Sequence, residues 1–206
     1  MFSVKDKIII VTGASGVIGS AISVALAING AKLAILGRHE KKLQITFEKI
    51  AEFGDEHIQF PCDVLNVESL QKAKEAIQTK FEKIDALINV AGGATKGAST
   101  KVEFLNDDTP MEDSFFGVNL DDFGYTSDLN FMGSVNPIKV FGESMAEQKS
   151  GNIINISSMG AIQPLSKSPA YSAGKAAISN FTQWLAVHLS KVNIRVNAIA
   201  PGFILT

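Results

Sequence analysis

Short apolar runs alternate along the chain with longer segments in which apolar residues recur at every third or fourth position. A continuous β-branched run is typical of a buried strand, and the wider spacing is typical of an amphipathic helix. Strands are predicted within residues 7–13, 32–37, 57–64, 84–93, 152–157 and 193–202. Helices are predicted within residues 20–30, 40–53, 66–81 and 169–189, with another around Asn130. This alternation predicts an α/β fold: a doubly wound parallel sheet with right-handed crossovers and helices on both faces.

Length and composition are those of a single folded domain covering residues 1–206. With 206 residues and 46% hydrophobic content, the chain can bury a full core. Its net charge of −2 gives no indication of a nucleic-acid or membrane-surface partner. The apolar run at residues 8–11 is too short for a secretory signal or a membrane span, so we expect a cytoplasmic protein. Cys62 is the only cysteine, which excludes an internal disulfide and indicates a structural thiol.

A glycine-rich turn joins the first predicted strand to the first predicted helix. In KIIIVTGASGVIG, residues 7–19, the glycines would let the backbone turn tightly and approach a pyrophosphate, whose charge the free amides of the helix would meet. A strand, a turn, a helix and a second strand in this order predict a dinucleotide site of the Rossmann type. The residues expected to contact the dinucleotide are Gly13, Ser15, Gly16, Val17, Ile18 and Gly19.

The end of the second predicted strand bears on the choice of cofactor. Sites specific for NAD commonly place an acidic residue there, which binds the ribose hydroxyls. This chain has Gly37 followed by Arg38, whose guanidinium suits a 2′-phosphate. Arg38 could equally be a solvated surface arginine. The sequence therefore favours NADP modestly and leaves NAD open.

Two further strand ends complete the predicted dinucleotide site. Asp63 and Val64 come at the end of the third predicted strand, where Asp63 would meet the adenine ring. Asn89, Ala91 and Gly92 end the fourth predicted strand, beside the first one. The strand order of a doubly wound sheet reverses between these two strands and leaves a crevice at their carboxyl ends. We expect the residues that end the fourth strand to line this crevice.

One stretch contains the groups needed for acid/base chemistry. Tyr171 and Lys175 are four residues apart on one face of a predicted helix, so a phenol and an ammonium lie side by side. A neighbouring positive charge favours the phenolate and suits the tyrosine to proton transfer. Ser158 follows a predicted strand and could supply a hydroxyl that holds the reacting oxygen. A Tyr and a Lys at this spacing also occur often by chance, so the motif alone is weak.

Motifs spread over the full length of the chain resemble the short-chain dehydrogenase/reductase family. They are TGASGVIG at 12–19, NVAGG at 89–93, Asn130, Ser158, YSAGK at 171–175 and APGFILT at 200–206. The resemblance implies an oxidoreductase in which Tyr171 is the general acid/base and Ser158 orients the substrate oxygen. Lys175 would assist the tyrosine and hold the nicotinamide ribose, and Asn130 would support a water relay to it. Residues that the resemblance places around the nicotinamide are Pro201, Gly202, Ile204 and Thr206, together with Tyr171 and Lys175.

Two features depart from the family's commonest pattern. Its glycines correspond to positions 13, 17 and 19, whereas this chain has Gly13, Gly16 and Gly19 with Val17 between them. An epimerase branch of the family has such spacing, but it usually carries an acid after the second strand, and that acid is missing here. The second departure is an insertion of roughly 35 residues, 94–128, and insertions of that length are usually functional lids or disordered segments.

Acidic residues predominate in the insertion and predict a solvated surface loop. A divalent-metal site built from these acids is an alternative, although their spacing matches no ligand pattern, and overall we predict no metal site. The acids concerned are Asp107, Asp108, Glu112 and Asp113. The insertion also contains several phenylalanines, which predict that part of it folds down as a cover over the pocket. These are Phe104, Phe115, Phe116 and Phe123.

Within the family, the chain is most similar to a group of bacterial enzymes, the D-mannonate oxidoreductases or fructuronate reductases. The similarity lies in the insertion, the Gly16–Val17 variant and the stretch from LNFMGSVNP to QWLAVH. It implies NAD(P)-dependent reduction of the ketone of a six-carbon keto-sugar acid, whose carboxylate Lys96 or Lys167 could hold. The alternatives are a 3-ketoacyl reductase, another polyol or sugar dehydrogenase, and a non-catalytic dinucleotide sensor. The acidic insertion opposes an acidic carrier protein, and a sensor would be expected to lose the catalytic residues.

The resemblance also implies an assembly and a missing part. The helices that contain Asn130 and Tyr171 resemble the pair that forms the family's dimer contact, and Phe181 and Trp184 give the second helix extra apolar surface. We therefore expect a homodimer or homotetramer. Family members usually continue beyond the sixth strand through a substrate-covering helix and a seventh strand. The sequence ends at Thr206, so we expect this substrate-covering part to be absent.

Overall fold

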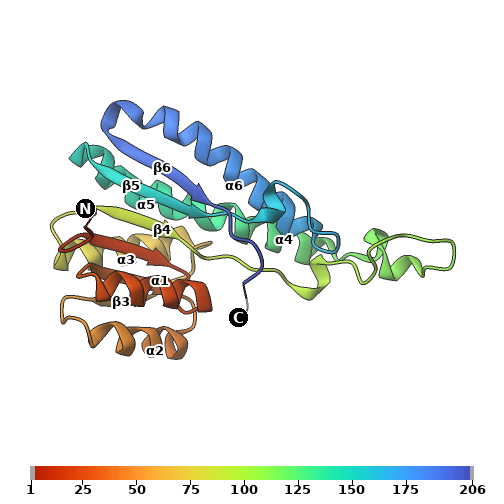
Figure 1. Ribbon diagram of the computed structural model, residues 1–206, viewed down its shortest axis with the longest axis horizontal. Helices are drawn as coiled ribbons and strands as arrows, with labels where there is room; N and C mark the ends of the chain where they lie inside the picture. The colour runs from red at the N-terminus through yellow and green to blue at the C-terminus, as the bar shows by residue number, and fades with distance from the viewer. Residues whose placement is uncertain (1–2, 205–206) are drawn as a thin grey trace.

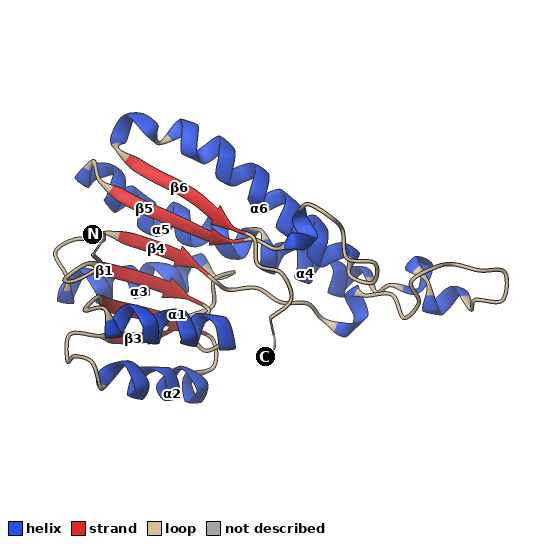
Figure 2. Ribbon diagram, viewed as in Figure 1, coloured by secondary structure: helices blue, strands red, loops and turns tan. Residues whose placement is uncertain are grey.

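A parallel sheet forms the centre of the molecule and confirms the predicted α/β fold. The computed structural model describes residues 3–204, and within them six strands pair in the order β3-β2-β1-β4-β5-β6 (Figures 1 and 2). The strands are β1 (Ile8–Thr12), β2 (Lys32–Gly37), β3 (Ile58–Pro61), β4 (Ala86–Asn89), β5 (Gly151–Ile156) and β6 (Ile194–Ile199). The order reverses between β1 and β4, which pair with Ile9 opposite Ala86. The crevice that the sequence predicts therefore lies at this point.

Helices cover both faces of the sheet and supply two separate cores (Figure 1). They are α1 (Val17–Ile28), α2 (Glu40–Ala51), α3 (Val67–Lys80), α4 (Leu120–Asn130), α5 (Met132–Gln148) and α6 (Pro169–His188). Successive side chains of a strand point to opposite faces, so Ile8 and Ile10 of β1 belong to one core and Ile9 and Val11 to the other. The first core is completed by α3, α5 and α6, and the second by α1 and α2.

The long predicted insertion is only partly a loop. Its last residues, 120–128, are the first nine residues of α4, so the loop itself ends at Asn119. The loop between β4 and α4 contains three short 3₁₀ helices: η1 (Lys96–Ala98), η2 (Met111–Asp113) and η3 (Phe115–Gly117). We call residues 99–119 the arm, because this segment projects away from the carboxyl ends of the strands (Figure 1). A projecting segment buries little surface, which is consistent with its many charged residues.

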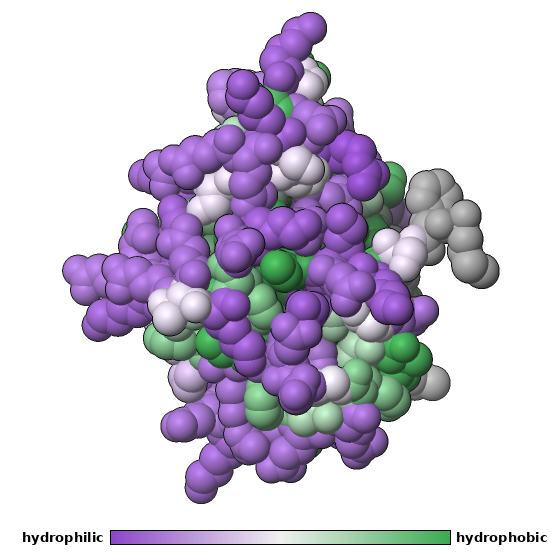
Figure 3. Space-filling view, turned by 90° about the vertical axis from the view of Figure 1, so that its left-hand side faces the viewer, coloured by the Kyte–Doolittle hydropathy of each residue, from purple (hydrophilic) through white to green (hydrophobic). Residues whose placement is uncertain are grey.

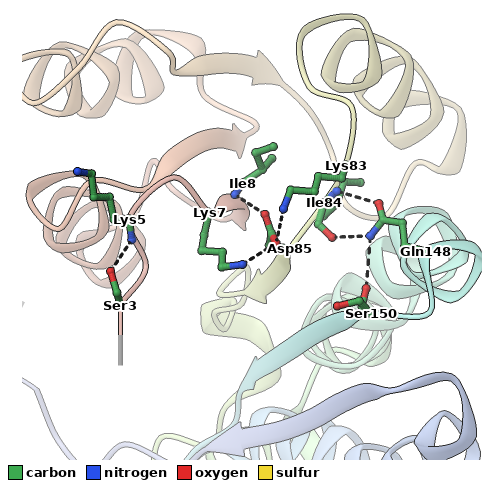
Figure 4. Close-up of polar contacts among 9 residues, drawn as sticks. All are labelled: Ser3, Lys5, Lys7, Ile8, Lys83, Ile84, Asp85, Gln148 and Ser150. Carbon is green, nitrogen blue, oxygen red and sulfur yellow. Dashed lines mark hydrogen bonds and ion pairs between the residues drawn. The ribbon is translucent and has the colours of Figure 1, made fainter. Parts of the chain in front are cut away.

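The opposite end of the sheet, where the strands begin, carries a polar network. Asp85, just before β4, accepts hydrogen bonds from the backbone amide of Ile8 and from the ammonium groups of Lys7 and Lys83 (Figure 4). Burial alone would raise the pKa of Asp85, but these three donors outweigh it and hold the pKa below its usual value. The surrounding face is largely hydrophilic (Figure 3). This end therefore ties β1 to β4 structurally and lies far from the crevice.

Candidate active site

A large cavity opens at the carboxyl ends of β1, β4 and β5. Its volume is about 740 Å³, which is enough for a dinucleotide and a small substrate. Most of the residues predicted for the site line it: Gly13, Ser15, Gly16, Val17, Ile18, Gly19, Arg38, Val64, Ala91, Gly92, Ser158, Tyr171, Lys175, Pro201, Gly202 and Ile204. Asp63, Asn89 and Asn130 do not, and Thr206 lies outside the described residues.

The glycine turn between β1 and α1 has the shape of a phosphate cradle. Gly13 has a φ of +65°, and a Cβ built there would lie 2.6 Å from the amide nitrogen of Ala91. A Cβ at Gly19 would lie 2.3 Å from the carbonyl oxygen of Gly13. Only glycine fits at these two positions, because either methyl group would collide with backbone. The first amides of α1 have no acceptor within the helix and can bind an anion at the turn.

The departure from the usual glycine spacing has a structural explanation. Val17 is the first residue of α1, and its side chain is 60% exposed, so the position accepts a branched side chain without a clash. Gly16 caps the helix with a φ of −88°, which other residues adopt freely, and its nearest Cβ contact would be 3.4 Å. The turn therefore depends on Gly13 and Gly19, and the residues between them can vary.

The cavity end beyond β2 and β3 is cationic and suits the adenosine half of a dinucleotide. Arg38, His39 and Lys42 line it. A Cβ at Gly37 would lie 2.8 Å from the hydroxyl oxygen of Ser15, so an acidic side chain could not enter at this position unless Ser15 moved. Arg38 donates a hydrogen bond from Nη1 to the phenol oxygen of Tyr125 in α4. Sequence reasoning missed Tyr125, because 87 residues separate it from Arg38.

The third strand contributes different residues from those expected. Cys62 and Val64 line the cavity, whereas Asp63 turns its carboxylate to the backbone amide of Leu65, at 3.0 Å. The prediction that Asp63 meets the adenine ring therefore has no support from the cavity wall. Burial raises the pKa of the Cys62 thiol and keeps it protonated, in keeping with a structural role.

Asn89 acts inside the fold and not at the cavity wall. Its side-chain amide donates to Asn155 of β5 at 2.9 Å, and Asn155 donates to Thr182 of α6, also at 2.9 Å. All three side chains are buried. This row of hydrogen bonds links β4, β5 and α6, so Asn89 helps to hold the helix that carries Tyr171 and Lys175 against the sheet.

The end of the cavity next to α6, where we expect the chemistry, contains Tyr171 and Lys175, one turn apart on that helix. Lys175 is only 3% exposed, and its ammonium nitrogen donates to the backbone carbonyl of Ile156 at 2.7 Å. The same nitrogen lies 5.8 Å from the centre of the Tyr171 ring. Burial lowers the pKa of Lys175 to about 8, because the charged form loses its hydration. A group with this pKa still carries its proton at neutral pH.

Ser158 lies two residues beyond β5 and faces the same end of the cavity. Its hydroxyl oxygen accepts a hydrogen bond from the amide of Gly160 at 3.0 Å, which leaves the hydroxyl proton available to a substrate oxygen. Backbone amides on either side of it bind β6 and the segment after it, from Ser157 to Ile199 and from Met159 to Pro201. These two bonds bring the segment that contains Pro201 and Gly202 close to Ser158.

Asn130 lies just behind the cavity wall. It is the last residue of α4, fully buried, and its side-chain amide donates to the carbonyl oxygens of Gly93 and Thr126. A Cβ at Gly92 would lie 2.8 Å from Asn130 Oδ1 and 3.2 Å from Lys175 Nζ. Asn130 and Lys175 therefore both approach Gly92 closely. Gly174 permits this approach, because a Cβ there would lie 2.9 Å from the Cβ of Asn130.

The substrate end differs from the prediction in three respects. Lys96 and Lys167, the two candidates for holding a substrate carboxylate, are both exposed and do not line the cavity. The arm does not cover the pocket: Phe116 is 72% exposed, and none of its phenylalanines lines the cavity. The side chains that do line this end, and that the sequence did not indicate, are Met159, Leu165, Ser168 and Phe203. Met159 begins a short 3₁₀ helix and the other three lie in loops, so no periodic pattern marks them and only the fold brings them together.

Neither a metal cluster nor a membrane span is found in the described residues. Over residues 3–204, no group of three His, Cys, Asp or Glu side chains could hold a metal ion, and Asp113 pairs with Lys101. In the same range no helix combines the length and the apolar character needed to cross a membrane.

Comparisons with known proteins agree with this geometry. The family model described as short chain dehydrogenase matches residues 7–206. The chain is 42% identical to an uncharacterized oxidoreductase of Haemophilus influenzae, over 99% of this chain and 72% of the relative. It is 44% identical to an uncharacterized oxidoreductase, UxuB, of Bacillus subtilis, over 99% of this chain and 73% of the relative.

Solved structures show the same similarity. A candidate D-mannonate oxidoreductase from Haemophilus influenzae with bound NAD superposes with a TM-score of 0.93 at 42% identity, over 99% of this chain and 73% of that one. An NAD⁺-bound xylitol dehydrogenase gives a TM-score of 0.86 at 32% identity, over 100% of this chain and 73% of that one. The chain therefore belongs to the short chain dehydrogenase family and is an oxidoreductase that uses a nicotinamide dinucleotide.

Proposed function

We propose that the protein interconverts a ketone and a secondary alcohol on a six-carbon keto-sugar acid, with fructuronate and mannonate as the pair. The observation that carries the reaction type is the grouping of Ser158, Tyr171 and Lys175 at one end of a cavity whose other end suits a dinucleotide. The substrate class is supported by the candidate D-mannonate oxidoreductase, which is 42% identical and shares the fold along this chain.

The residues of the cavity fit a nicotinamide dinucleotide. The Gly13 and Gly19 cradle leaves room for a pyrophosphate next to the amides at the start of α1, and Tyr171 and Lys175 line the far end, where the nicotinamide ribose would lie. When bound, the nicotinamide supplies a hydride to the carbonyl carbon of the substrate in the reducing direction, and it accepts the hydride in the oxidising direction.

The side chains provide the proton. In the reducing direction the Tyr171 phenol gives its proton to the substrate oxygen, which becomes the hydroxyl of the product. The Ser158 hydroxyl donates a hydrogen bond to the same oxygen and favours the negative charge that develops on it. The buried Lys175 charge, beside the tyrosine, stabilises the phenolate left behind. Asn130 is bonded to both backbone groups of Gly93 and so keeps the neighbouring Gly92 close to Lys175.

For the cofactor, we propose that both dinucleotides bind and that NADP binds more tightly. Arg38 and Lys42 line the adenosine end, and position 37 is a glycine where NAD-specific sites commonly have an acid. The two related structures with bound NAD support binding of the unphosphorylated form as well. Arg38→Ala should weaken NADP by about ten- to a hundredfold, the range for a lost charge-assisted contact, and hardly change NAD. Equal losses for both cofactors would contradict this assignment.

A polyol dehydrogenase is the second candidate, because the NAD⁺-bound xylitol dehydrogenase is 32% identical over the whole chain. It would use the same residues in the oxidising direction. Apart from Lys175, no lysine or arginine among the described residues lines the catalytic end of the cavity, so the wall itself does not require a carboxylate on the substrate. A 3-ketoacyl reductase is disfavoured, because the acidic arm would repel an acidic carrier protein.

The substrate proposal is tested by kcat/KM for a panel of keto-sugar acids, polyols and 3-ketoacyl thioesters, each with NAD(H) and NADP(H). We expect the highest value for fructuronate reduction and its reverse. A polyol with a higher kcat/KM than any sugar acid would favour the second candidate. Activity on thioesters alone would contradict both.

We also propose that the protein assembles as a homodimer or homotetramer. Trp184 on α6 is 56% exposed although it stacks between Phe181 and His188, and Val187 beside it is exposed too. A contiguous apolar surface of this kind on a packed helix is typical of a protein contact. Light scattering at micromolar concentration should give a mass of at least two chains, and Trp184→Glu should reduce it. A monomeric wild-type protein would contradict the proposal.

A further inference from the structure

Tyr125, which lies outside the predicted site, contacts Arg38, the residue proposed to bind the 2′-phosphate of NADP. Arg38 follows β2 directly, is exposed, and lines the adenosine end of the cavity. Its Nη1 atom donates a hydrogen bond to the phenol oxygen of Tyr125. No carboxylate of the described residues forms an ion pair with Arg38. The contact with Tyr125 therefore fixes the direction of the guanidinium and leaves its positive charge uncompensated.

Tyr125 belongs to a firmly anchored helix. Thr126, the next residue, is fully buried, and its hydroxyl accepts a hydrogen bond from the backbone amide of Thr95 at 3.2 Å. At the end of α4, Asn130 packs closely against Gly174 of α6. Leu129, one turn after Tyr125, lines the cavity on the same side of the helix. The phenol thus reaches Arg38 from a rigid support.

We propose that Tyr125 is a positioning residue for recognition of the 2′-phosphate of NADP, a role that rests on the proposed contact between Arg38 and this phosphate. A guanidinium has five N–H donors, and the phenol takes one of them. The remaining donors stay free for a phosphate. Because a long arginine side chain loses much rotamer freedom when it binds, holding it in place beforehand lowers the cost of binding.

This role makes a selective prediction. The unphosphorylated cofactor lacks the 2′-phosphate with which Arg38 would form an ion pair, so the contact with Tyr125 should matter for NADP alone. Tyr125→Phe keeps the ring and removes only the hydroxyl. Loss of one hydrogen bond should raise the Kd of NADP by about two- to tenfold, and the Kd of NAD should stay within about twofold of the wild-type value.

The experiment measures the Kd of NADP and of NAD by calorimetry, without substrate, for the wild-type chain, Tyr125→Phe, Arg38→Ala and the double variant. Ser127→Ala is the matched control, since it removes a buried hydroxyl from the same helix that has no hydrogen-bond partner within the described residues. The control should bind both cofactors like the wild type. The double variant should bind NADP no more weakly than Arg38→Ala, because Tyr125 acts only through Arg38.

Several outcomes would overturn the proposal. Tyr125→Phe could weaken both cofactors equally, leave NADP binding unchanged, or add its full effect to that of Arg38→Ala. If Arg38→Ala leaves NADP binding unchanged, the proposed phosphate contact fails, and the role of Tyr125 fails with it. If Arg38→Ala lowers affinity for NADP selectively but Tyr125→Phe does not, only the role of Tyr125 is contradicted.

Discussion

The ammonium nitrogen of Lys175 lies 5.8 Å from the centre of the Tyr171 ring, on the next turn of the same helix. Burial places this charge in surroundings of low dielectric constant, where its effect on the phenol is stronger than it would be in water. The same burial costs stability, because the charged amine gives up its hydration and regains only one hydrogen bond, to Ile156, within the described protein. The buried charge next to the reacting group therefore lowers the stability of the folded protein.

Burial of Lys175 makes the free energy of unfolding depend on pH, with a definite sign. The pKa of Lys175 is about 8 in the folded protein and about 10.4 in the unfolded chain, so between these values the unfolded state binds more protons. The free energy of unfolding should therefore rise with pH across this window, by about 1 to 2 kcal/mol between pH 8 and pH 9.5.

Urea denaturation of the cofactor-free protein at the two pH values checks this, with Lys175→Met as the reference that lacks the titrating group. The rise should be present in the wild type and absent from the variant. If the two proteins change in parallel, burial of Lys175 has no energetic cost of this size.

The close approach of α4 and α6 depends on Gly174. A methyl group there would lie 2.9 Å from the Cβ of Asn130 and 3.1 Å from the carbonyl oxygen of Ser127, so the helices would have to separate. Gly174→Ala should lower the free energy of unfolding by about 1 to 3 kcal/mol, the usual cost of overpacking. It should also lower kcat, because Asn130 would move away from Gly92 and Lys175.

Gly124 provides the matched control, since it lies on α4 and a Cβ there would have nothing within 4 Å. Gly124→Ala should stabilise the protein by about 0.5 to 1 kcal/mol, as expected for alanine in a helix. Thermal unfolding and steady-state rates of both variants test the pair. Similar behaviour of the two variants would show that the helices are not in close contact at Gly174.

The glycine turn gives a third pair of variants. Gly13→Ala meets both a φ of +65° and a backbone collision, so it should lower the free energy of unfolding by about 2 to 4 kcal/mol. Gly16→Ala meets neither and should cost less than about 1 kcal/mol. Chemical denaturation without cofactor checks the difference. Equal costs would mean that the turn does not have the geometry described.

The order of strands and helices was predictable because a local hydrophobic period determines it. A buried run such as 8–11 and a three-to-four spacing such as Leu70, Ala73 and Ile77 indicate the element without knowledge of the fold. The common location of Ser158, Tyr171 and Lys175 at the cavity was predictable for a related reason. Ser158 follows a strand directly, and Tyr171 and Lys175 are four residues apart on one helix. The fold therefore places all three at one end of the cavity.

Other parts of the site depend on contacts between distant segments. Nothing local to Arg38 indicates that Tyr125 will reach it, and nothing near Asn89 indicates that its amide will bind Asn155 instead of facing the crevice. The sequence pattern also could not predict the direction in which the arm projects. The presence of several phenylalanines suggested a cover over the pocket. Whether such side chains fold inward depends on packing surfaces outside the arm.

The most direct test of the account is the turnover of Tyr171→Phe, measured together with its dinucleotide affinity. The substitution keeps the ring and removes only the proton that the mechanism transfers. General acid/base groups contribute about 10²- to 10⁴-fold in rate, so kcat should fall by at least about a hundredfold, while the Kd of NADP stays near the wild-type value. If Tyr171→Phe turns over within a few-fold of the wild type while binding the cofactor normally, Tyr171 is not the proton donor and the proposed mechanism is wrong.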